Sequence, residues 1–334
     1  MEIQNRRALK DAAGCSLAQA SDSPKKLLLL HLSVTFILSL LLSIVDSLLE
    51  QQIGAAGGLS GLGSRSLMTT VRMLLRLSQT VLLPFWQMGY LFLTLKLCRG
   101  EAVNPQTLLE GFRKFGLVLR YHLIVGVLFL GIVLASSYLS GMLFLLSPFS
   151  GPLMEEFEQL LSNSQIAEDA GALELATMEL AMKYATPILI VFGIVFLVLF
   201  IPLFCRYRMA GFVLLDTPEI GAIHALKTSG KMMRHHWLDV FKLDLSFWWF
   251  YLLEALVAAV SYGDALLSLA GVSLPISPNV LYFLFLIAGM LCQLALYWWR
   301  KNEVSVTYAH AYAVLRSAIP ESPAPQPKNP PWGV

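Results

Sequence analysis

Charged residues are scarce in this chain. Only 14% of its 334 residues are Asp, Glu, Lys or Arg, whereas 56% are hydrophobic. Soluble domains carry about 25% charged residues, so most of this sequence is not expected to face water. The net charge of +2 says little by itself. The composition therefore predicts a membrane protein whose main surroundings are the lipid bilayer, and we expect no nucleic-acid partner.

Cysteine and histidine are also sparse and lack the spacing of a metal site. The four cysteines (Cys15, Cys98, Cys205 and Cys292) are far apart in the sequence. We expect reduced thiols rather than disulfides or zinc ligands. The adjacent His235 and His236 would point about 100° apart on a helix, so they cannot easily share one ion. We therefore predict no metal site and no cofactor.

Catalytic motifs are missing as well. The sequence contains no Gly-x-Ser-x-Gly elbow, no phosphate-binding loop and no dinucleotide fingerprint. Asp239 and Asp244 are the nearest thing to a pair of catalytic carboxylates, but on one helix they would point about 140° apart. The sequence therefore predicts a protein that is not an enzyme.

Long apolar runs, by contrast, dominate the chain. A membrane-spanning helix needs about 20 apolar residues, and six runs meet this requirement. They lie at 27–48, 77–97, 117–146, 187–204, 237–260 and 280–299. The first run is too long for the apolar part of a cleavable signal peptide. We predict an all-α fold, a polytopic membrane helix bundle with about six transmembrane helices plus amphipathic interfacial helices.

The segments around these runs differ in composition. Residues 1–26 form a basic segment with the spacing of a short amphipathic helix, and the membrane domain is predicted to cover residues 27–317. A flexible loop is expected at 50–66. The acidic segment 150–184 is predicted to hold two short amphipathic helices, at about 153–162 and 168–182. The proline-rich tail, 318–334, is predicted to be disordered.

The distribution of Lys and Arg predicts the orientation. The N-terminal segment, residues 98–116, residues 206–236 and the C-terminal flank hold most of the loop cations. Because cytoplasmic loops are enriched in Lys and Arg, both termini are expected in the cytoplasm. The acidic segment would then be extracytoplasmic.

Two basic surface helices are predicted on the cytoplasmic side. One follows Asn104-Pro105, an N-cap with proline at the first helical position, and the other follows Thr217-Pro218. Cations near a membrane surface attract anionic lipids by about 1 kcal/mol each. The candidate contacts are Arg113, Lys114, Lys227, Lys231 and Arg234. The alternative is that these cations only set the topology and extend to the interface.

Ionisable residues inside the predicted spans form a second group of candidates, because each is costly in a bilayer without a partner. The topology places Asp46, Arg72, Arg76 and Glu254 towards the outer half of the membrane. We hypothesise an Arg76–Glu254 ion pair with Asp46 nearby. On one continuous fifth span, Glu254 would share a polar stripe about 80° wide with Asp239, Ser246 and Ser261. The cluster would form a path for protons or a polar solute, or else a structural bridge.

Several short motifs, taken in order, resemble one known family. They are Arg6-Arg7-Ala8-Leu9-Lys10, Gly89-Tyr90, Cys98-Arg99-Gly100-Glu101, Arg206-Tyr207-Arg208, Leu215-Asp216-Thr217-Pro218, Ala225-Leu226-Lys227-Thr228-Ser229-Gly230-Lys231-Met232-Met233 and Phe241-Lys242-Leu243-Asp244-Leu245-Ser246-Phe247. Their order is similar to that in the uncharacterised bacterial membrane proteins catalogued as domain of unknown function 975. The resemblance covers about residues 5–315. It implies a multi-span bacterial membrane protein and supplies no activity and no site residues.

The expected function follows from these observations. The basic surface helices and the missing catalytic motifs favour a non-enzymatic protein of the bacterial plasma membrane that organises or regulates lipids or partner proteins. The alternative is a transporter or channel component that uses the intramembrane polar cluster.

Overall fold

A computed structural model describes residues 3–21, 23–55, 62–148, 150–162, 170–269, 271–272 and 275–318. These residues form helices and their connections, and no strand occurs among them. The chain divides into two compact units, unit 1 (1–120 and 209–334) and unit 2 (121–208). The predicted all-α class is confirmed.

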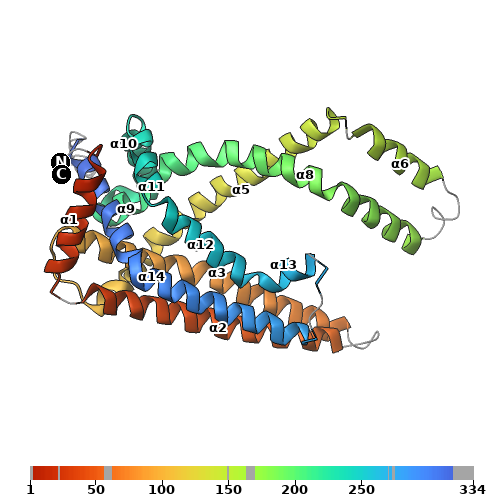
Figure 1. The fold of residues 1–334 in the computed structure, drawn as a ribbon, viewed down its shortest axis with the longest axis horizontal. Helices are drawn as coiled ribbons and strands as arrows, with labels where there is room; N and C mark the ends of the chain where they lie inside the picture. The colour runs from red at the N-terminus through yellow and green to blue at the C-terminus, as the bar shows by residue number, and fades with distance from the viewer. Residues whose placement is uncertain are drawn as a thin grey trace, which may run out of the picture. The chain divides into compact units, whose positions relative to one another are not determined.

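Unit 1 is a bundle of long helices with shorter ones at its end (Figure 1). Its helices are α1 (Arg6–Gln19), α2 (Pro24–Ala55), α3 (Leu62–Cys98), α4 (Glu110–Arg113), α9 (Ala210–Asp216), α10 (Gly221–Met233), α11 (Trp237–Leu245), α12 (Trp248–Ser261), α13 (Gly263–Leu269) and α14 (Pro278–Ser317). Two 3₁₀ turns, Pro105–Leu109 and Pro218–Ile220, complete the ordered connections. The first turns of α5 (Phe115–Leu145) also belong to this unit.

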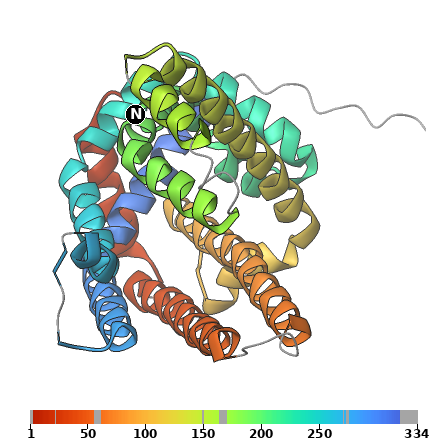
Figure 2. The ribbon, with the colours of Figure 1, turned by 90° about the vertical axis from the view of Figure 1, so that its right-hand side faces the viewer.

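The last helix, α14, is the element around which unit 1 is packed. It contacts α1, α2, α3, α12 and α13, and α2, α3 and α14 run side by side (Figures 1 and 2). Its 40 residues extend about 60 Å. Polar contacts fix its register: the Tyr90 hydroxyl donates to Asn302 Oδ1 at 2.9 Å. The Ser16 hydroxyl lies 3.0 Å from His310 Nε2.

Two glycines bring backbones of unit 1 into direct contact. A Cβ on Gly89 would lie 1.8 Å from the carbonyl oxygen of Leu108, and one on Gly111 would lie 2.0 Å from that of Phe85. The segment after Asn104 therefore packs tightly on α3, and Leu108 is fully buried. An interfacial amphipathic helix was predicted here. The structure instead has a 3₁₀ turn and the four-residue α4, because the close backbone approach holds the segment against the bundle.

The N-terminal helix α1 also packs inside the unit. Asn5 caps it by accepting a hydrogen bond from the backbone N–H of Ala8 at 3.1 Å. Leu9 and Ala13, on its apolar face, are fully buried. The predicted short helix within residues 1–26 is present, and its apolar side covers α14 and α3.

The predicted fifth span is broken. Helix α11 ends at Leu245, α12 begins at Trp248, and their axes differ by 65°. The prediction of one continuous polar stripe is therefore wrong. Because of the bend, Asp239 and Ser246 do not lie on the same helix as Glu254. Neither proline nor glycine stands at the break, so local propensity does not account for it.

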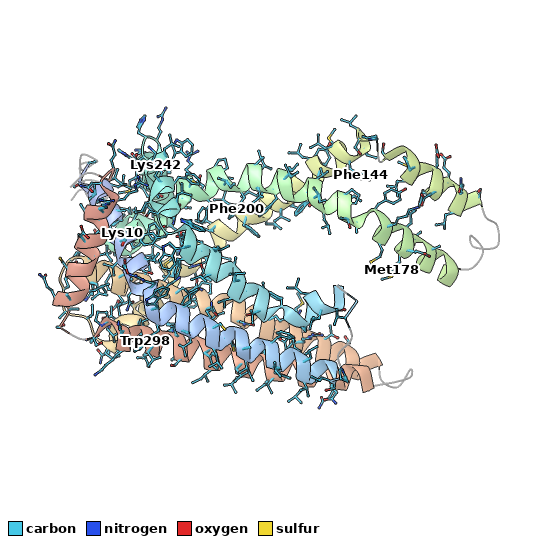
Figure 3. The ribbon with its side chains drawn as sticks, viewed as in Figure 1. Lys10, Phe144, Met178, Phe200, Lys242 and Trp298 are labelled. Atoms are coloured by element: carbon cyan, nitrogen blue, oxygen red, sulfur yellow. The ribbon has the colours of Figure 1, made fainter. Side chains whose placement is uncertain are left out.

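Unit 2 consists of the rest of α5, α6 (Ser150–Ser162) and α8 (Ala170–Tyr207). Four phenylalanines spaced four residues apart stack along α8, with ring centroids 6.0, 5.2 and 5.6 Å apart; they are Phe192, Phe196, Phe200 and Phe204. From α5, Phe129 meets two of these rings edge-on at 6.0 and 6.3 Å. Figure 3 labels Phe200 on this ladder. Contacts between aromatic rings thus join α5 to α8.

Five helices are long and apolar enough to cross a membrane, or up to six if α11 and α12 count as one span. This confirms a bundle with about six apolar spans. The helices extend further than expected, since most of the loop at 50–66 belongs to α2 and α3. The second short helix predicted in the acidic segment is the start of α8. Residues 56–61, 163–169 and the tail from 319 lie outside the described part of the chain.

Candidate functional site

The structure brings together three of the four predicted intramembrane residues. Asp46 of α2 accepts hydrogen bonds from Arg72 Nε at 2.6 Å and from Arg76 at 2.8 Å, both on α3. A second Arg72 nitrogen lies 3.2 Å from the other carboxylate oxygen, so this contact is bidentate. Because the two arginines are one helical turn apart, a single carboxylate can serve both. The group ties α2 to α3.

Glu254 lies elsewhere in unit 1. Its carboxylate accepts a hydrogen bond from the hydroxyl of Tyr297 on α14, and Gln293 donates to the same hydroxyl at 3.2 Å. Arg76 is bonded to Asp46 instead, so the structure does not form the hypothesised Arg76–Glu254 pair. The reason is packing: α12 lies against α14, whereas Arg76 lies on α3 where it faces α2.

Polar contacts hold the break between α11 and α12. The ammonium of Lys10 donates to the backbone carbonyl of Ser246 at 3.1 Å and lies 4.1 Å above the ring of Phe247. On the other side, the Tyr308 hydroxyl donates to Asp244 and lies 2.7 Å from the hydroxyl of Tyr251. Helices α1 and α14 therefore stabilise the bend from two directions.

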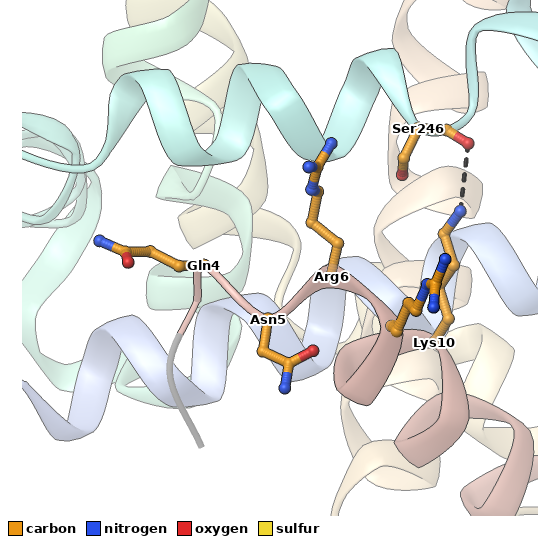
Figure 4. A pocket seen from close by; sticks show the side chains of 6 residues that line it. Gln4, Asn5, Arg6, Lys10 and Ser246 are labelled. Atoms are coloured by element: carbon orange, nitrogen blue, oxygen red, sulfur yellow. Dashed lines mark hydrogen bonds between the residues drawn. The ribbon is translucent and has the colours of Figure 1, made fainter.

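A cleft opens next to this break. It has a volume of about 450 Å³ and is lined by Gln4, Asn5, Arg6, Arg7, Lys10 and Ser246 (Figure 4). A smaller cavity of about 210 Å³, lined by Gln4, Arg6, Asp239 and Lys242, adjoins it through shared residues. Burial lowers the pKa of Lys10, and the charges of Arg6 and Arg300 act in the same direction against Glu303. The cleft itself is lined by three positively charged side chains, those of Arg6, Arg7 and Lys10.

The five predicted lipid contacts fall into two groups. Lys227 and Lys231 of α10 and Arg234, its C-cap residue, lie on one exposed side, and none of their side chains makes a hydrogen bond or ion pair with any described residue. Arg113 is bonded to Glu110 at 2.8 Å, and Lys114 lies 4.9 Å above the ring of Phe92. The α4 cations thus have partners inside the protein, and those of α10 do not.

A third polar group connects three motifs that are far apart in the sequence. Asp216, at the end of the buried helix α9, accepts hydrogen bonds from Arg99 and, at 2.7 Å, from the hydroxyl of Tyr312. Although burial disfavours the charge of Arg99, the hydrogen bond and the charge of Asp216 raise its pKa. This group joins the ends of α3, α9 and α14, and we assign it to structure.

Sequence reasoning missed the cleft and the groups around the break. Arg6, Arg7 and Lys10 were recognisable as a basic segment, but nothing in their spacing indicates Ser246, which lies 236 residues from Lys10. The described residues contain no group of three or more His, Cys, Asp or Glu that could hold a metal ion.

Comparison with known proteins now adds the family. Residues 1–299 match the family described as Protein of unknown function (DUF975). The chain belongs to this family. The DUF975 match ends inside α14, earlier than the resemblance predicted, so Asn302, Tyr308 and Tyr312 lie beyond it. No curated protein and no solved structure shows significant similarity to this DUF975 chain.

Proposed function

We propose that this DUF975 protein is a non-enzymatic, multi-pass protein of the bacterial plasma membrane that binds anionic lipid headgroups and so organises lipids around it. The observation that carries the proposal is the unpartnered basic side of α10. Lys227, Lys231 and Arg234 project from this side without a partner among the described residues.

The face of α10 is basic along its whole length. His224, Lys227, Lys231 and Arg234 are all exposed, and at 100° per residue they lie within about 80° of one another. The opposite face is buried, with Ala225, Leu226, Ser229, Met232 and Met233 packed inside the unit. Because the buried face fixes the rotation of the helix about its axis, the cations all point to the exposed side.

Helix α11 adds an exposed apolar face beside these cations. Trp237, Leu238, Phe241 and Leu245 are about half exposed and lie on one side of the helix, while Val240 and Leu243 are buried on the other. Its nine residues extend about 13 Å, too short for the ~30 Å apolar core of a bilayer. A short helix with an exposed aromatic face next to a basic helix favours the membrane interface.

The orientation proposed is both termini in the cytoplasm. The Ser16–His310 contact ties α1 to the last turns of α14, which supports one common side for the two ends of the described chain. Lys10 and Lys242 lie at this same end of unit 1 (Figure 3). Helices α10 and α11 are also found there (Figure 1). Positive charge marks the cytoplasmic side, and the family resemblance supports the proposal of a bacterial source.

The test measures lipid retention. The full-length protein, purified from membranes that contain phosphatidylglycerol and phosphatidylcholine, is examined by native mass spectrometry. We expect the wild type to retain phosphatidylglycerol preferentially. The double variant Lys227→Gln/Lys231→Gln should bind it ~30-fold more weakly, because each cation contributes about 1 kcal/mol near the surface.

A second double variant provides a comparison with the same loss of charge. Arg113→Gln/Lys114→Gln should reduce retention less, because Glu110 already neutralises Arg113 and Lys114 lies over an aromatic ring. Equal retention of the two lipids by the wild type, or equal losses in the two double variants, would contradict the proposal.

Transport is the second candidate function. It is favoured by the chain of hydrogen-bonding groups formed by Glu254, Tyr297 and Gln293 within the apolar helices α12 and α14. In proteoliposomes, a flux of protons or solute that Glu254→Gln abolishes would support transport. No flux in the wild type would exclude this role for the group.

A further inference from the structure

The cleft beside α1 differs from the α10 surface because it is concave and cationic. Three of its six lining residues carry a positive charge, namely Arg6, Arg7 and Lys10, and the other three are neutral. Asp239 lines only the adjoining cavity, where it lies 3.5 Å from a ring nitrogen of His236. Like charges in one cleft repel each other, so an anion there would be stabilised.

The walls of the cleft are held in place by buried contacts. Ile3 and Leu9, on either side of the arginines, are buried at 5% and 0% exposure. Asn5 is fixed as the cap of α1, and Lys10 is fixed by Ser246 and by the ring of Phe247. Figure 4 shows Lys10 reaching the Ser246 carbonyl across the cleft. The backbone that carries the arginines and the ammonium of Lys10 are therefore positioned before any ligand arrives.

Most of the hydrogen-bond donors in the cleft remain available. Of the five N–H donors of Arg6, the described contacts use one, which goes to the carbonyl oxygen of Lys242 at 3.3 Å. Lys10 uses one of its three donors on the carbonyl of Ser246. Arg7 donates to no described residue. Two guanidinium groups and an ammonium are suited to several oxygens of one anion.

We propose that this cleft is a binding site for a phosphate-bearing anion, with Arg6, Arg7 and Lys10 of α1 contacting the phosphate oxygens beside the α11–α12 break. The volume of about 450 Å³ leaves room for a polar group attached to the phosphate, such as glycerol. Both an anionic lipid headgroup and a soluble phosphate monoester have this chemistry. This site is separate from the α10 surface and extends the function beyond general attraction to lipids.

The experiment uses the full-length protein in phosphatidylcholine nanodiscs and isothermal titration calorimetry. Two probes are titrated: glycerol 3-phosphate, and short-chain dihexanoyl phosphatidylglycerol. Arg7→Gln should weaken binding at least ~10-fold, because a charged hydrogen bond to an anion is lost. The side chain of Arg7 makes no hydrogen bond or ion pair with a described residue and is exposed, so this variant should fold normally, and its melting temperature checks this.

Lys25→Gln serves as the matched control. Lys25 is an exposed cation at the start of α2 and does not line the cleft. Its replacement should change the affinity less than ~2-fold, since general electrostatic attraction alone depends on no particular cation. Equal weakening by Arg7→Gln and Lys25→Gln would overturn the site, as would the absence of binding by both probes.

The two probes also separate the possible sources of the ligand. Binding of the short-chain lipid alone supports a headgroup site, and binding of both probes supports a soluble phosphate monoester as the ligand. This test changes Arg7, whereas the test of the α10 surface changes Lys227 and Lys231. Each proposal can therefore fail while the other stands.

Discussion

Unit 1 and unit 2 use glycine in opposite ways. In unit 1, a Cβ on Gly89, Gly111 or Gly289 would lie about 2 Å from an atom of another segment. In unit 2, Gly126 and Gly193 have nothing within 4 Å of the same position. Some glycines of unit 1 therefore permit close packing between segments, whereas the described glycines of unit 2 do not bring helices together.

The polar contacts differ in the same direction. Unit 1 is tied by hydrogen bonds between distant segments, such as Tyr90 to Asn302 and Tyr312 to Asp216. In unit 2, Phe129 of α5 meets phenylalanine rings of α8 edge-on, and the Glu156–Lys183 pair joins α6 to α8. The packing of unit 1 thus depends on close backbone contacts and on hydrogen bonds between particular residues. The packing of unit 2 depends on apolar side chains, which can shift to accommodate a change in a neighbour.

The largest effect is expected from Gly89→Ala. The new methyl group would meet the carbonyl oxygen of Leu108, which is backbone and cannot move aside alone. We expect a loss of at least about 3 kcal/mol of stability or failure to accumulate, measured by thermal unfolding in detergent. Gly126→Ala in unit 2 is the control, and it should leave stability unchanged or raise it by up to about 1 kcal/mol. Similar losses in both variants would refute the comparison.

A smaller but still large effect is expected from Asp46→Asn. This change leaves Arg72 and the largely exposed Arg76 without their carboxylate, at a cost of about 2 kcal/mol, because two hydrogen bonds to a charged group are lost. Thermal unfolding measures it, and Asp264→Asn, which removes an acid without a described partner, should have little effect. Adding Arg72→Gln to Asp46→Asn should recover part of the loss. A stable single variant would show that the ion pair does not hold α2 to α3.

The smallest effect is expected in unit 2, at Glu156. Hydrogen bonds from Lys183 and Tyr184 lower its pKa. A lowered carboxyl pKa stabilises the folded state above the unfolded value, and this stabilisation is lost as the pH falls through the folded value. The melting temperature should therefore drop more for the wild type than for Glu156→Gln between pH 7 and acidic pH. Parallel curves would show that the pair contributes nothing.

The positions of the long helices were predictable because the formation of each helix depends mainly on the apolar residues within it. An apolar run of about 20 residues dictates a helix in a bilayer wherever its neighbours lie, and the structure has five to six long apolar helices. The fifth run also met this criterion, yet it is bent by 65°. The contacts that hold the bend come from Lys10 and Tyr308, and no local pattern can report partners so distant in the sequence.

The candidate sites were predictable only in part for the same reason. The arginines on α3 and Asp46 are close in sequence and belong to consecutive spans, so their meeting could be foreseen. The predicted pairing of Glu254 with Arg76 is wrong, because the carboxylate accepts a hydrogen bond from the hydroxyl of Tyr297 instead. The positions of charged residues in the sequence do not indicate this neutral donor. Exposed cations on α10 could be identified from helical periodicity, but whether a cation has a partner depends on tertiary structure.

The position of α14 in the chain has a consequence for biosynthesis. Chains fold from the N-terminus as they are made, and α14 is the last described helix to emerge. Until then Tyr90 lacks Asn302, Asp216 lacks Tyr312 and α1 lacks the surface that buries Leu9. Unit 1 is therefore assembled only after α14 has been made, and before that point Asp216 has Arg99 as a partner but not Tyr312.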